Sequence, residues 1–386
     1  MYNSKVKENN FTNIFILETL DLPVIYDLNS FSDRIGLSKR ILYLLSNNSK
    51  IYYSQFKIPK SNGIDYRVID SPKYSMKLVQ RWILKEILEK IPVSSVAMAF
   101  KPGVGNGAKH NAKIHSEKLF SLVLDIENFF QSIPAGRIYY LFKSLGYNVT
   151  ISTILTNLCT LEGSLPQGGV CSPYLSNLVC IKLDKRMSGL CSKRDIVYSR
   201  YADDLTFSSD NKVVLKKVFY IIKEIISDEG FLVNEKKTRF LSPSSHKAIT
   251  GITVNNKELK ANKSIKRKVR TMIHNSIVSC DHSQNDVIRG YVSYINSIEE
   301  GYKDKIIDYI NRLKEKNYKH DKELVKQFNL NKLYKEVKDM EYQEIPYGSE
   351  DEIDYFTNRY YYLLERGLIE DEDLEIDQSN VLATPF

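Results

Sequence analysis

Residues 197–209, with the sequence VYSRYADDLTFSS, constrain the fold more than any other stretch of the 386-residue chain. β-Branched and aromatic residues stand on both sides of Ala202, Asp203 and Asp204, which predicts two short strands joined by a tight turn. Upstream, residues 118–130 (KLFSLVLDIENFF) predict a buried strand that ends at a third acid, Asp125. If that strand lies beside the hairpin, the three carboxylates meet at one edge of a sheet.

Three carboxylates that meet in this way repel one another unless a hard cation binds between them. Mg²⁺ is the usual occupant of such a site, where it also bridges to the phosphates of a substrate. Two such ions, roughly 3.5–4 Å apart, activate an attacking hydroxyl and stabilise the leaving oxygen of a phosphoryl displacement. An isolated Asp-Asp pair is also good turn chemistry, so the pair alone leaves both interpretations open.

Charge along the chain points to a polyanionic partner. The whole chain carries a formal net charge of +8, yet residues 341–378 hold thirteen Asp and Glu against two Arg, a local balance of −11. The remainder therefore carries +19, and so basic a body favours binding to nucleic acid. A single Lys-rich run, such as residues 312–323, is equally well explained as a solvated face.

Cysteine spacing and hydropathy narrow the class of protein. The five cysteines are never spaced as Cys-x-x-Cys, which argues against both a disulfide framework and a zinc site, so we interpret them as reduced packing residues. No apolar run is long enough for a membrane span, and the first residues lack the apolar core of a signal peptide. We therefore expect a cytoplasmic globular protein with no membrane partner.

The chain divides into three parts. Residues 1–255 mix short strand-like runs with helices, residues 256–318 are helical and basic, and the chain from 319 onward is polar and then acidic. Helical periodicity is clearest where Ser172, as N-cap, and Pro173, at the first helical position, precede Leu175, Leu178, Val179 and Leu183 on one face. The turn LPQGGV (165–170) opens that helix and lets backbone come close to a ligand.

Together these motifs resemble the palm of reverse transcriptases, in that family's order. Asp-x-x-x-Phe-Phe ends the strand at 125–130, Leu-Pro-Gln-Gly forms the turn, and Tyr-Ala-Asp-Asp forms the hairpin. GFLVNEKKT (230–238) is similar to the Gly-x-x-x-Asn-x-x-Lys element that follows the hairpin, and RVIDSP (67–72) is similar to part of the fingers.

Three further segments resemble bacterial retron reverse transcriptases more narrowly. NAKIH (111–115) and ITGITVN (249–255) are similar to two signatures of that family, and IRGYVSYINSIE (288–299) is similar to the Arg-Gly-aromatic helix of its thumb. The resemblance covers about residues 15–315, and the combination is specific although each motif alone is weak. Ile249 stands where the family usually has Val.

The resemblance implies the roles of the acidic residues. Asp125 and Asp203 are expected to be the principal ligands of two Mg²⁺ ions, Asp204 to stand beside them as the third catalytic carboxylate, and Ile126 to belong to the metal set. An inactive scaffold that binds RNA and an effector is an alternative, which the three retained acids argue against because a pure binder gains nothing from clustered like charges.

The resemblance also implies contacts to the incoming nucleotide. Phe130 stands where the family places a bulky ring against the sugar, so a ribose 2′-hydroxyl would clash and the product should be DNA. We expect neighbouring Phe129 to be a plain core residue. Arg67 is expected to grip the triphosphate, and Lys237 to protonate or neutralise the pyrophosphate leaving group. For both cations, an ordinary surface position is the alternative.

Two more groups complete the expected substrate contacts. Gln167 and Gly168 are expected to form the floor beneath the templating base and the incoming nucleotide, and Asn111 and His115, in the retron-specific element, to bind RNA. For His115 the alternative is a hydrogen-bonded structural histidine.

Residues 262–278 (NKSIKRKVRTMIHNSIV) predict a basic amphipathic helix, with apolar residues on one side and cations along a nucleic-acid backbone. The cations expected to contact RNA are Lys266, Arg267 and Arg270. A membrane surface is a less favoured partner, because the segment lacks Trp and Phe anchors.

We therefore expect an α+β, right-hand polymerase with fingers and palm in 1–255, a helical thumb in 256–318 and an acidic C-terminal extension in 319–386. The resemblance implies RNA-directed synthesis of a short multicopy single-stranded DNA from dNTPs. The template would be a structured noncoding RNA, and an internal guanosine 2′-hydroxyl of that RNA would be the primer. The resemblance also implies a role in antiphage defence, together with a separate effector. Its partners are then that RNA, the RNA–DNA hybrid and the single-stranded product. Another bacterial reverse transcriptase is the alternative; an RNA-dependent RNA polymerase is disfavoured by Phe130.

The extension combines apolar and aromatic residues with a strongly acidic end. Residues 354–377 hold Tyr355, Phe356, Tyr360, Tyr361, Leu363, Leu364, Leu368 and Ile369. Such a segment, if helical, exposes too much apolar surface to stay free in water, so we expect it to dock either on the basic polymerase surface or on an effector protein.

Overall fold

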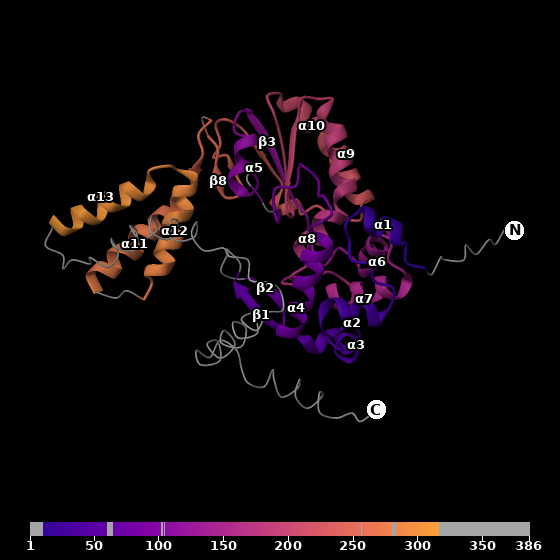
Figure 1. Ribbon diagram of the computed structural model, residues 1–386. Coiled ribbons are helices and arrows are strands. Elements are labelled where there is room, and N and C mark those ends of the chain that lie inside the picture. The colour runs from indigo at the N-terminus through magenta and orange to yellow at the C-terminus, as the bar shows by residue number, and fades with distance from the viewer. Residues whose placement is uncertain are drawn as a thin grey trace. The chain divides into compact units, whose positions relative to one another are not determined.

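The computed structural model of the chain describes residues 11–59, 65–101, 103, 105–255, 257–279 and 283–315 (Figure 1). These residues form two compact units. The first comprises the described residues up to Arg267 together with Tyr294–Glu300, and the second comprises those in Lys268–Ser293 and those from Gly301 onward. The expectations for the acidic extension fall outside the described residues.

A four-stranded antiparallel sheet with the order β4-β5-β3-β6 lies at the centre of the first unit (Figure 1). Its strands are β3 (Phe120–Asp125), β4 (Val197–Tyr201), β5 (Asp204–Ser209) and β6 (Arg239–Leu241). β3 lies between β5 and β6 and is buried from its second residue to its last, because its sequence is an almost unbroken apolar run. The predicted hairpin and the predicted strand beside it are both confirmed.

Helices pack against this sheet. α9 (Ile181–Ser192) contacts β4, and α10 (Lys212–Asp228) contacts β3 and β5. Figure 1 shows α10 next to β3. α10 begins where the Asn211 side chain accepts hydrogen bonds from two backbone N–H groups of the first turn, and it buries one stripe of apolar residues at helical spacing. α5 (Ala108–Ile114) contacts β4 and the short strand β8 (Ile252–Thr253). Three helices, α5, α9 and α10, therefore contact the strands of this sheet.

The remainder of the first unit combines a two-stranded sheet with a group of helices. β1 (Tyr53–Pro59) pairs antiparallel with β2 (Tyr66–Pro72), which confirms the strand-like character of residues 67–72. The helices are α1 (Ile14–Thr19), α2 (Leu28–Ile35), α3 (Lys39–Asn47), the 3₁₀ turn Ser49–Tyr52, α4 (Tyr74–Ile83) with a π-helical continuation Leu84–Leu88, α6 (Ala135–Ser144), α7 (Val149–Cys159) and α8 (Ser172–Val179).

The helix predicted after Ser172 is present, but two details of the prediction are wrong. Ser172 is the first helical residue rather than the N-cap, and its buried hydroxyl has no hydrogen-bond partner among the described residues. The helix also ends at Val179, so Leu183 belongs to the next helix, α9. Pro173 still occupies the first turn, where its missing N–H costs nothing.

The chain continues from β6 into a small three-stranded antiparallel sheet and then into long helices. The strands are β7 (Ala248–Ile249), β8 (Ile252–Thr253) and β9 (Lys260–Ala261), and the helices are α11 (Lys263–Ser279), α12 (Asn285–Ile298) and α13 (Tyr302–Glu315). Most of the described residues of the segment predicted to be helical are therefore helical, while its start carries β9. α11 buries Val269, Ile273 and Ile277 along one face.

An apolar core runs through the first unit and includes four cysteines. Cys159, Cys171, Cys180 and Cys191 are buried in it as free thiols, as expected of packing residues; Cys280 lies outside the described residues. Burial raises the pKa of Cys180 to about 11 and of Cys191 to about 12.

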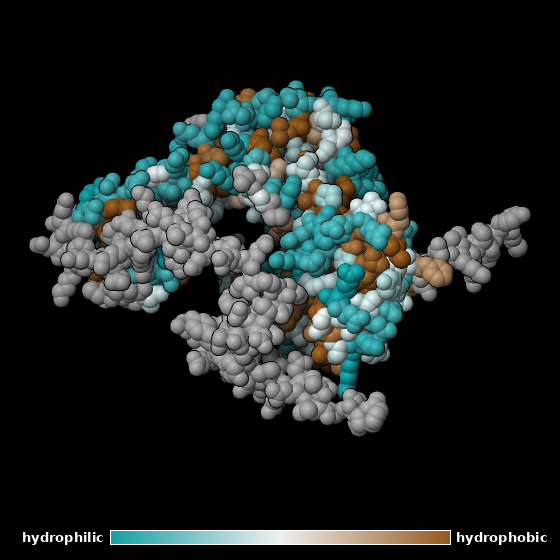
Figure 2. Space-filling view, viewed as in Figure 1, coloured by the Kyte–Doolittle hydropathy of each residue, from teal (hydrophilic) through white to brown (hydrophobic). Residues whose placement is uncertain are grey.

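Hydrophilic residues cover most of the coloured surface in Figure 2. Among the described residues, no helix is long and apolar enough to cross a membrane.

Candidate active site

The three acidic residues meet at one end of the central sheet. Asp125, the last residue of β3, lies directly opposite Asp204, the first residue of β5. Asp203 occupies the turn between β4 and β5, and its carbonyl oxygen accepts a 2.9 Å hydrogen bond from the backbone N–H of Ile126. The end of β3 is thereby tied to the turn, and this placement agrees with the expected convergence.

The turn that carries Asp203 has an unusual backbone. Tyr201 pairs with Asp204, so Ala202 and Asp203 form a two-residue hairpin loop. Ala202 has a φ of 56°, in the left-handed region that favours glycine. A non-glycine residue holds this conformation only when the surrounding structure fixes it, which makes the position of Asp203 a property of its neighbours.

Burial and like charge raise the pKa values of two of the carboxyls. Asp203 has a raised pKa because of burial and, next, the nearby Asp125 charge. The pKa of Asp204 rises to about 6, first through burial and then through the charges of Asp203 and Asp125. Lys237 opposes these shifts: its Nζ lies 2.7 Å from Oδ2 of Asp125. Burial and the mutual repulsion of the carboxylates therefore outweigh the neighbouring cations at Asp203 and Asp204.

Phe100 and Phe130 form an aromatic wall, and Phe130 follows Asp125 by five residues in the chain. Phe129 is buried in the core, as expected, while Phe130 is only partly buried. The Phe130 ring packs against Phe129, with centroids 5.5 Å apart, and against Phe100 at 6.3 Å. Phe100 is 41% exposed and has a φ of 57°, so it adopts the left-handed backbone conformation, as Ala202 does.

The turn that carries Gln167 and Gly168 lies against β2. The backbone N–H of Asp70 donates a 2.8 Å hydrogen bond to the carbonyl of Gln167. At Gly168, with a φ of 131°, a Cβ would lie 2.5 Å from the Asp70 carbonyl oxygen. Arg67, on the same strand, is exposed. Its positive charge partly opposes the rise in the pKa of Asp203 that burial causes. The structure thus brings Arg67 and the turn to the side of the site formed by β2.

Comparison with known proteins decides the family. The sequence model described as reverse transcriptase (RNA-dependent DNA polymerase) matches residues 58–276. The Retron Ec86 reverse transcriptase of Escherichia coli is 33% identical over 312 residues, which cover 81% of this chain and 97% of that one. The Retron Mx65 reverse transcriptase of Myxococcus xanthus is 33% identical over 267 residues, covering 64% and 62%. The chain belongs to the retron reverse transcriptases. It is an RNA-directed DNA polymerase with the right-hand polymerase fold of that family.

A solved telomerase from Candida albicans, in complex with a fragment of telomeric RNA, is also similar in structure to this reverse transcriptase. The similarity has a TM-score of 0.39 and 12% sequence identity, and it covers 68% of this chain and 58% of that one. At that level it adds nothing to the assignment.

The retron-specific residues lie inside the reverse transcriptase rather than on its surface. Asn111 and His115, on and just after α5, are fully buried. The two ring nitrogens of His115 lie 2.6 Å from the Ser208 hydroxyl and 2.7 Å from the Ser199 hydroxyl, and Ser199 donates to Asn111 Oδ1 at 2.5 Å. Burial lowers the pKa of His115 to about 3, so it is neutral at pH 7. These side chains join α5 to β4 and β5 and cannot reach RNA, which supports the structural alternative for His115.

The cations predicted for α11 differ in their surroundings. Lys266 is partly buried and forms an ion pair with Glu299, while Arg267 is exposed. Arg270 is exposed, and its guanidinium lies 5.8 Å from the centre of the Tyr309 ring. RNA binding by these three residues stays a prediction.

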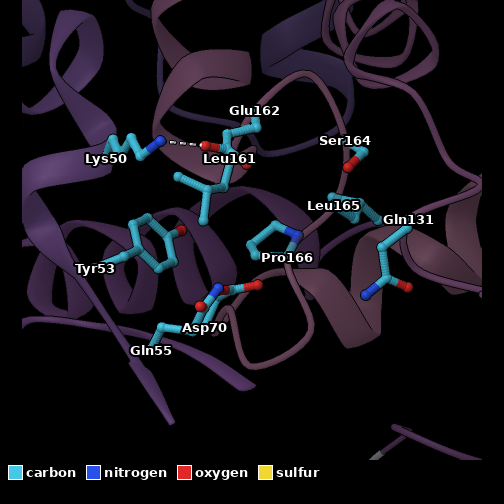
Figure 3. A pocket seen from close by; sticks show the side chains of 10 residues that line it. All are labelled: Lys50, Tyr53, Gln55, Asp70, Gln131, Leu161, Glu162, Ser164, Leu165 and Pro166. Atoms are coloured by element: carbon cyan, nitrogen blue, oxygen red, sulfur yellow. Dashed lines mark hydrogen bonds and ion pairs between the residues drawn. The ribbon is translucent and has the colours of Figure 1, made fainter. Parts of the chain in front are cut away.

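A polar pocket of about 330 Å³ lies in this reverse transcriptase where the turn at 165–170 meets β2 (Figure 3). Its lining comprises Lys50, Tyr53, Gln55, Asp70, Gln131, Leu161, Glu162, Ser164, Leu165 and Pro166. Lys50 pairs with Glu162 at 2.6 Å, and Gln55 donates to Asp70 at 2.9 Å. With two carboxylates and one ammonium, the pocket suits an uncharged polar group better than a phosphate.

Sequence reasoning missed a buried group behind the reverse transcriptase hairpin. Arg200, Asp184 and Asn177 are all fully buried, and Arg200 pairs with both carboxylate oxygens of Asp184. The available signal was an arginine within a predicted strand of β-branched and aromatic residues. Nothing in the sequence alone identifies its partners, which lie on α8 and α9.

Proposed function

We propose that this reverse transcriptase copies a structured noncoding RNA into a short multicopy single-stranded DNA, primed from the 2′-hydroxyl of an internal guanosine of that RNA. The observation that carries the proposal is Asp125 lying opposite Asp204, with Asp203 in the adjoining turn. Kinship with retron reverse transcriptases supports the RNA template, and the excess of +19 outside the acidic tail supports an RNA–DNA hybrid as partner.

The donor set at the sheet end fits a divalent cation. Reverse transcriptase domains generally use divalent metal ions. Among the described residues, no three His, Cys, Asp or Glu side chains form a ready-made metal cage. Mg²⁺ does not require one, because it commonly takes one or two protein carboxylates together with water and substrate phosphates. Burial, and next the like charge of neighbouring carboxylates, raises the pKa values of Asp203 and Asp204, and a cation would compensate that like charge.

We assign two Mg²⁺ ions to this end of the sheet, with Asp125 and Asp203 as principal ligands and Asp204 beside them. Ile126 has an apolar side chain, so only its backbone carbonyl could contribute. When bound, the ions supply activation of the attacking hydroxyl and stabilisation of the leaving oxygen. We propose that Lys237, which pairs with Asp125, neutralises or protonates the pyrophosphate.

The remaining contacts concern the incoming nucleotide. Arg67 binds the triphosphate through its guanidinium, which matches phosphate geometry. Gln167 and Gly168 support the templating base, and the Phe130 ring faces the sugar and excludes a 2′-hydroxyl. The substrates are accordingly dNTPs.

We propose an α+β organisation with fingers and palm in 1–255, a thumb in 256–318 that holds the nucleic acid through α11, and a C-terminal extension in 319–386. A cytoplasmic location would give the enzyme access to its RNA and to dNTPs.

Nucleic acid that copurifies with the protein tests the function directly. We expect sequencing and nuclease digestion to identify a branched molecule in which DNA is joined to RNA through a 2′-linkage at one guanosine. Linear complementary DNA with an ordinary primer would instead favour another bacterial reverse transcriptase activity. RNA without any DNA, together with inactivity on a primed template, would favour an RNA-binding scaffold.

The acidic tail is proposed to recruit a separate effector protein in antiphage defence, since its charge and apolar residues suit a docking segment. We expect deletion of residues 341–386 to leave DNA synthesis within about twofold of the full chain, while abolishing effector copurification and phage protection. Loss of synthesis on truncation would indicate docking on the polymerase itself. Retention of synthesis, effector binding and protection would contradict the proposal.

A further inference from the structure

The buried group behind the hairpin is a continuous hydrogen-bonded network. Nε and Nη2 of Arg200 donate to the two carboxylate oxygens of Asp184 at 2.8 and 2.7 Å. The hydroxyl of Tyr198 donates to the same carboxylate at 2.9 Å. Such a pair is well satisfied, but a buried ion pair gains little stability over apolar residues of similar volume. Folding energy alone therefore gives little reason for a charge at this place.

One branch of the network reaches the turn that carries Asp203. Nη1 of Arg200 donates to the carbonyl oxygen of Ala202 at 3.3 Å. Ala202 is the residue with the left-handed backbone, and its carbonyl belongs to the peptide bond that joins it to Asp203. Arg200 thus fixes the orientation of that peptide from inside the protein.

A second branch reaches the aromatic wall. The same Nη1 donates to Oδ1 of Asn177 at 3.0 Å, and Nδ2 of Asn177 donates to the carbonyl of Ala99 at 2.9 Å. The next residue, Phe100, has the left-handed φ of 57° and packs against Phe130. The Met98 N–H also donates to the Arg200 carbonyl at 2.8 Å. Residues 98–100 are therefore connected to Arg200 twice, directly through Met98 and through Asn177 at Ala99.

We propose that Arg200 and Asn177 are positioning residues that hold the turn of Asp203 and the Phe100–Phe130 wall in fixed relation, so that Asn177 sets the discrimination between deoxyribonucleotides and ribonucleotides. The proposal rests on the function assigned to Phe130 above. Asn177 acts at a distance: it touches neither nucleotide nor metal, and its effect passes through the Ala99 carbonyl and the strained Phe100 backbone to the Phe130 ring.

Asn177→Asp tests this with a small change. The variant keeps an oxygen for Arg200 but replaces the donor to Ala99 with a second oxygen, so that contact becomes repulsive. We expect the preference for deoxyribonucleotides, measured as the ratio of kcat/KM values on a primed RNA template, to fall about tenfold. Asn177→Ser, which is too short to bridge Arg200 and Ala99, should change the ratio in the same direction and serves if the aspartate variant does not fold.

Tyr198→Phe is the matched control, because it removes a hydrogen bond to Asp184 without altering the bonds to Ala202 or Ala99. It should lower the melting temperature and leave the ratio unchanged. An equal change of the ratio in this control would show that any destabilisation of the network alters nucleotide discrimination. That result would overturn the proposal. A wild-type ratio in the folded Asn177 variants would overturn it too.

A double-mutant cycle with Phe130→Ala separates this inference from the proposed function. If Asn177 acts through Phe130, the double variant should have the ratio of Phe130→Ala alone, whereas independent effects would multiply. Multiplication would contradict the inferred route. If Phe130→Ala itself leaves the ratio at the wild-type value, the role proposed for Phe130 is wrong, whatever the Asn177 variants do.

Discussion

The purified Asp203→Asn protein is expected to extend a primer on an RNA template at less than about one-thousandth of the wild-type rate, since the removal of one group that stabilises transition-state charge costs roughly 10²–10³ and a lost metal ligand costs at least as much. The substitution changes one oxygen to nitrogen in a two-residue turn, so it should not disturb the packing of β4 or β5. Primer extension assayed over a range of Mg²⁺ concentrations gives the measurement, and wild-type-like extension would contradict the catalytic assignment.

The same variant should fold at least as well as the wild type. Asp204, with a pKa raised to about 6 in the folded protein, is protonated there between about pH 4 and 6 while it is ionised in the unfolded chain. Stability from this group is therefore greatest at low pH and is lost as the pH rises through 6. Because the Asp203 charge contributes to that shift, Asp203→Asn should raise the melting temperature at pH 8 without metal and should keep RNA binding. A lower melting temperature would show that Asp203 has a structural role as well.

Gly168→Ala should reduce primer extension about 100-fold, because the new methyl group forces the turn away from β2. The added Cβ would lie 2.5 Å from the Asp70 carbonyl oxygen and 2.9 Å from the Ile69 side chain, and the φ of 131° is itself unfavourable for alanine. Overpacking of this kind costs about 1–3 kcal/mol, and a shift of about 1 Å at a substrate-positioning surface can cost 10²-fold in rate. Steady-state kinetics with each dNTP, together with chemical denaturation, measure the two effects.

Gly189→Ala is the matched control for that substitution. Gly189 lies inside α9 and is exposed, and a Cβ added there would meet no neighbouring side chain within 4 Å. Alanine there should stabilise the protein by about 0.5–1 kcal/mol and leave the kinetics unchanged. If Gly168→Ala behaves like this control, the turn does not need its close approach to β2.

The parts of the fold that follow local sequence pattern were predictable. The hairpin around Ala202 and the strand ending at Asp125 follow from runs of β-branched and apolar residues, whose preference for strands is expressed over a few neighbours. That Asp125 lies opposite Asp204 required only that the two segments pair in register. The exact ends of helices were less accessible, as Ser172 illustrates, because a cap depends on the side chain finding a free N–H.

The roles of buried polar residues were not predictable in the same way. Asn111 and His115 stand in a recognisable motif, yet their hydroxyl partners come from strands more than 80 residues away. The role of Asn177 likewise depends on its hydrogen bonds to Arg200 and Ala99, which are distant from it in the sequence. A polar side chain in a sequence can be exposed to solvent, bind a ligand or hold two parts of the fold together. Only its partners in the folded structure show which of these roles it has.

The burial of the thiols has a practical consequence for spectroscopy. A maleimide reacts with an exposed thiolate, and Cys180 and Cys191 are both buried and held in the protonated form at neutral pH. With Cys280 changed to serine, a cysteine placed at Tyr220, which is 70% exposed on α10, should become the one rapidly labelled position among the described residues. A fluorophore could then be attached to the folded enzyme at one known position while the buried cysteines of the core stay unchanged.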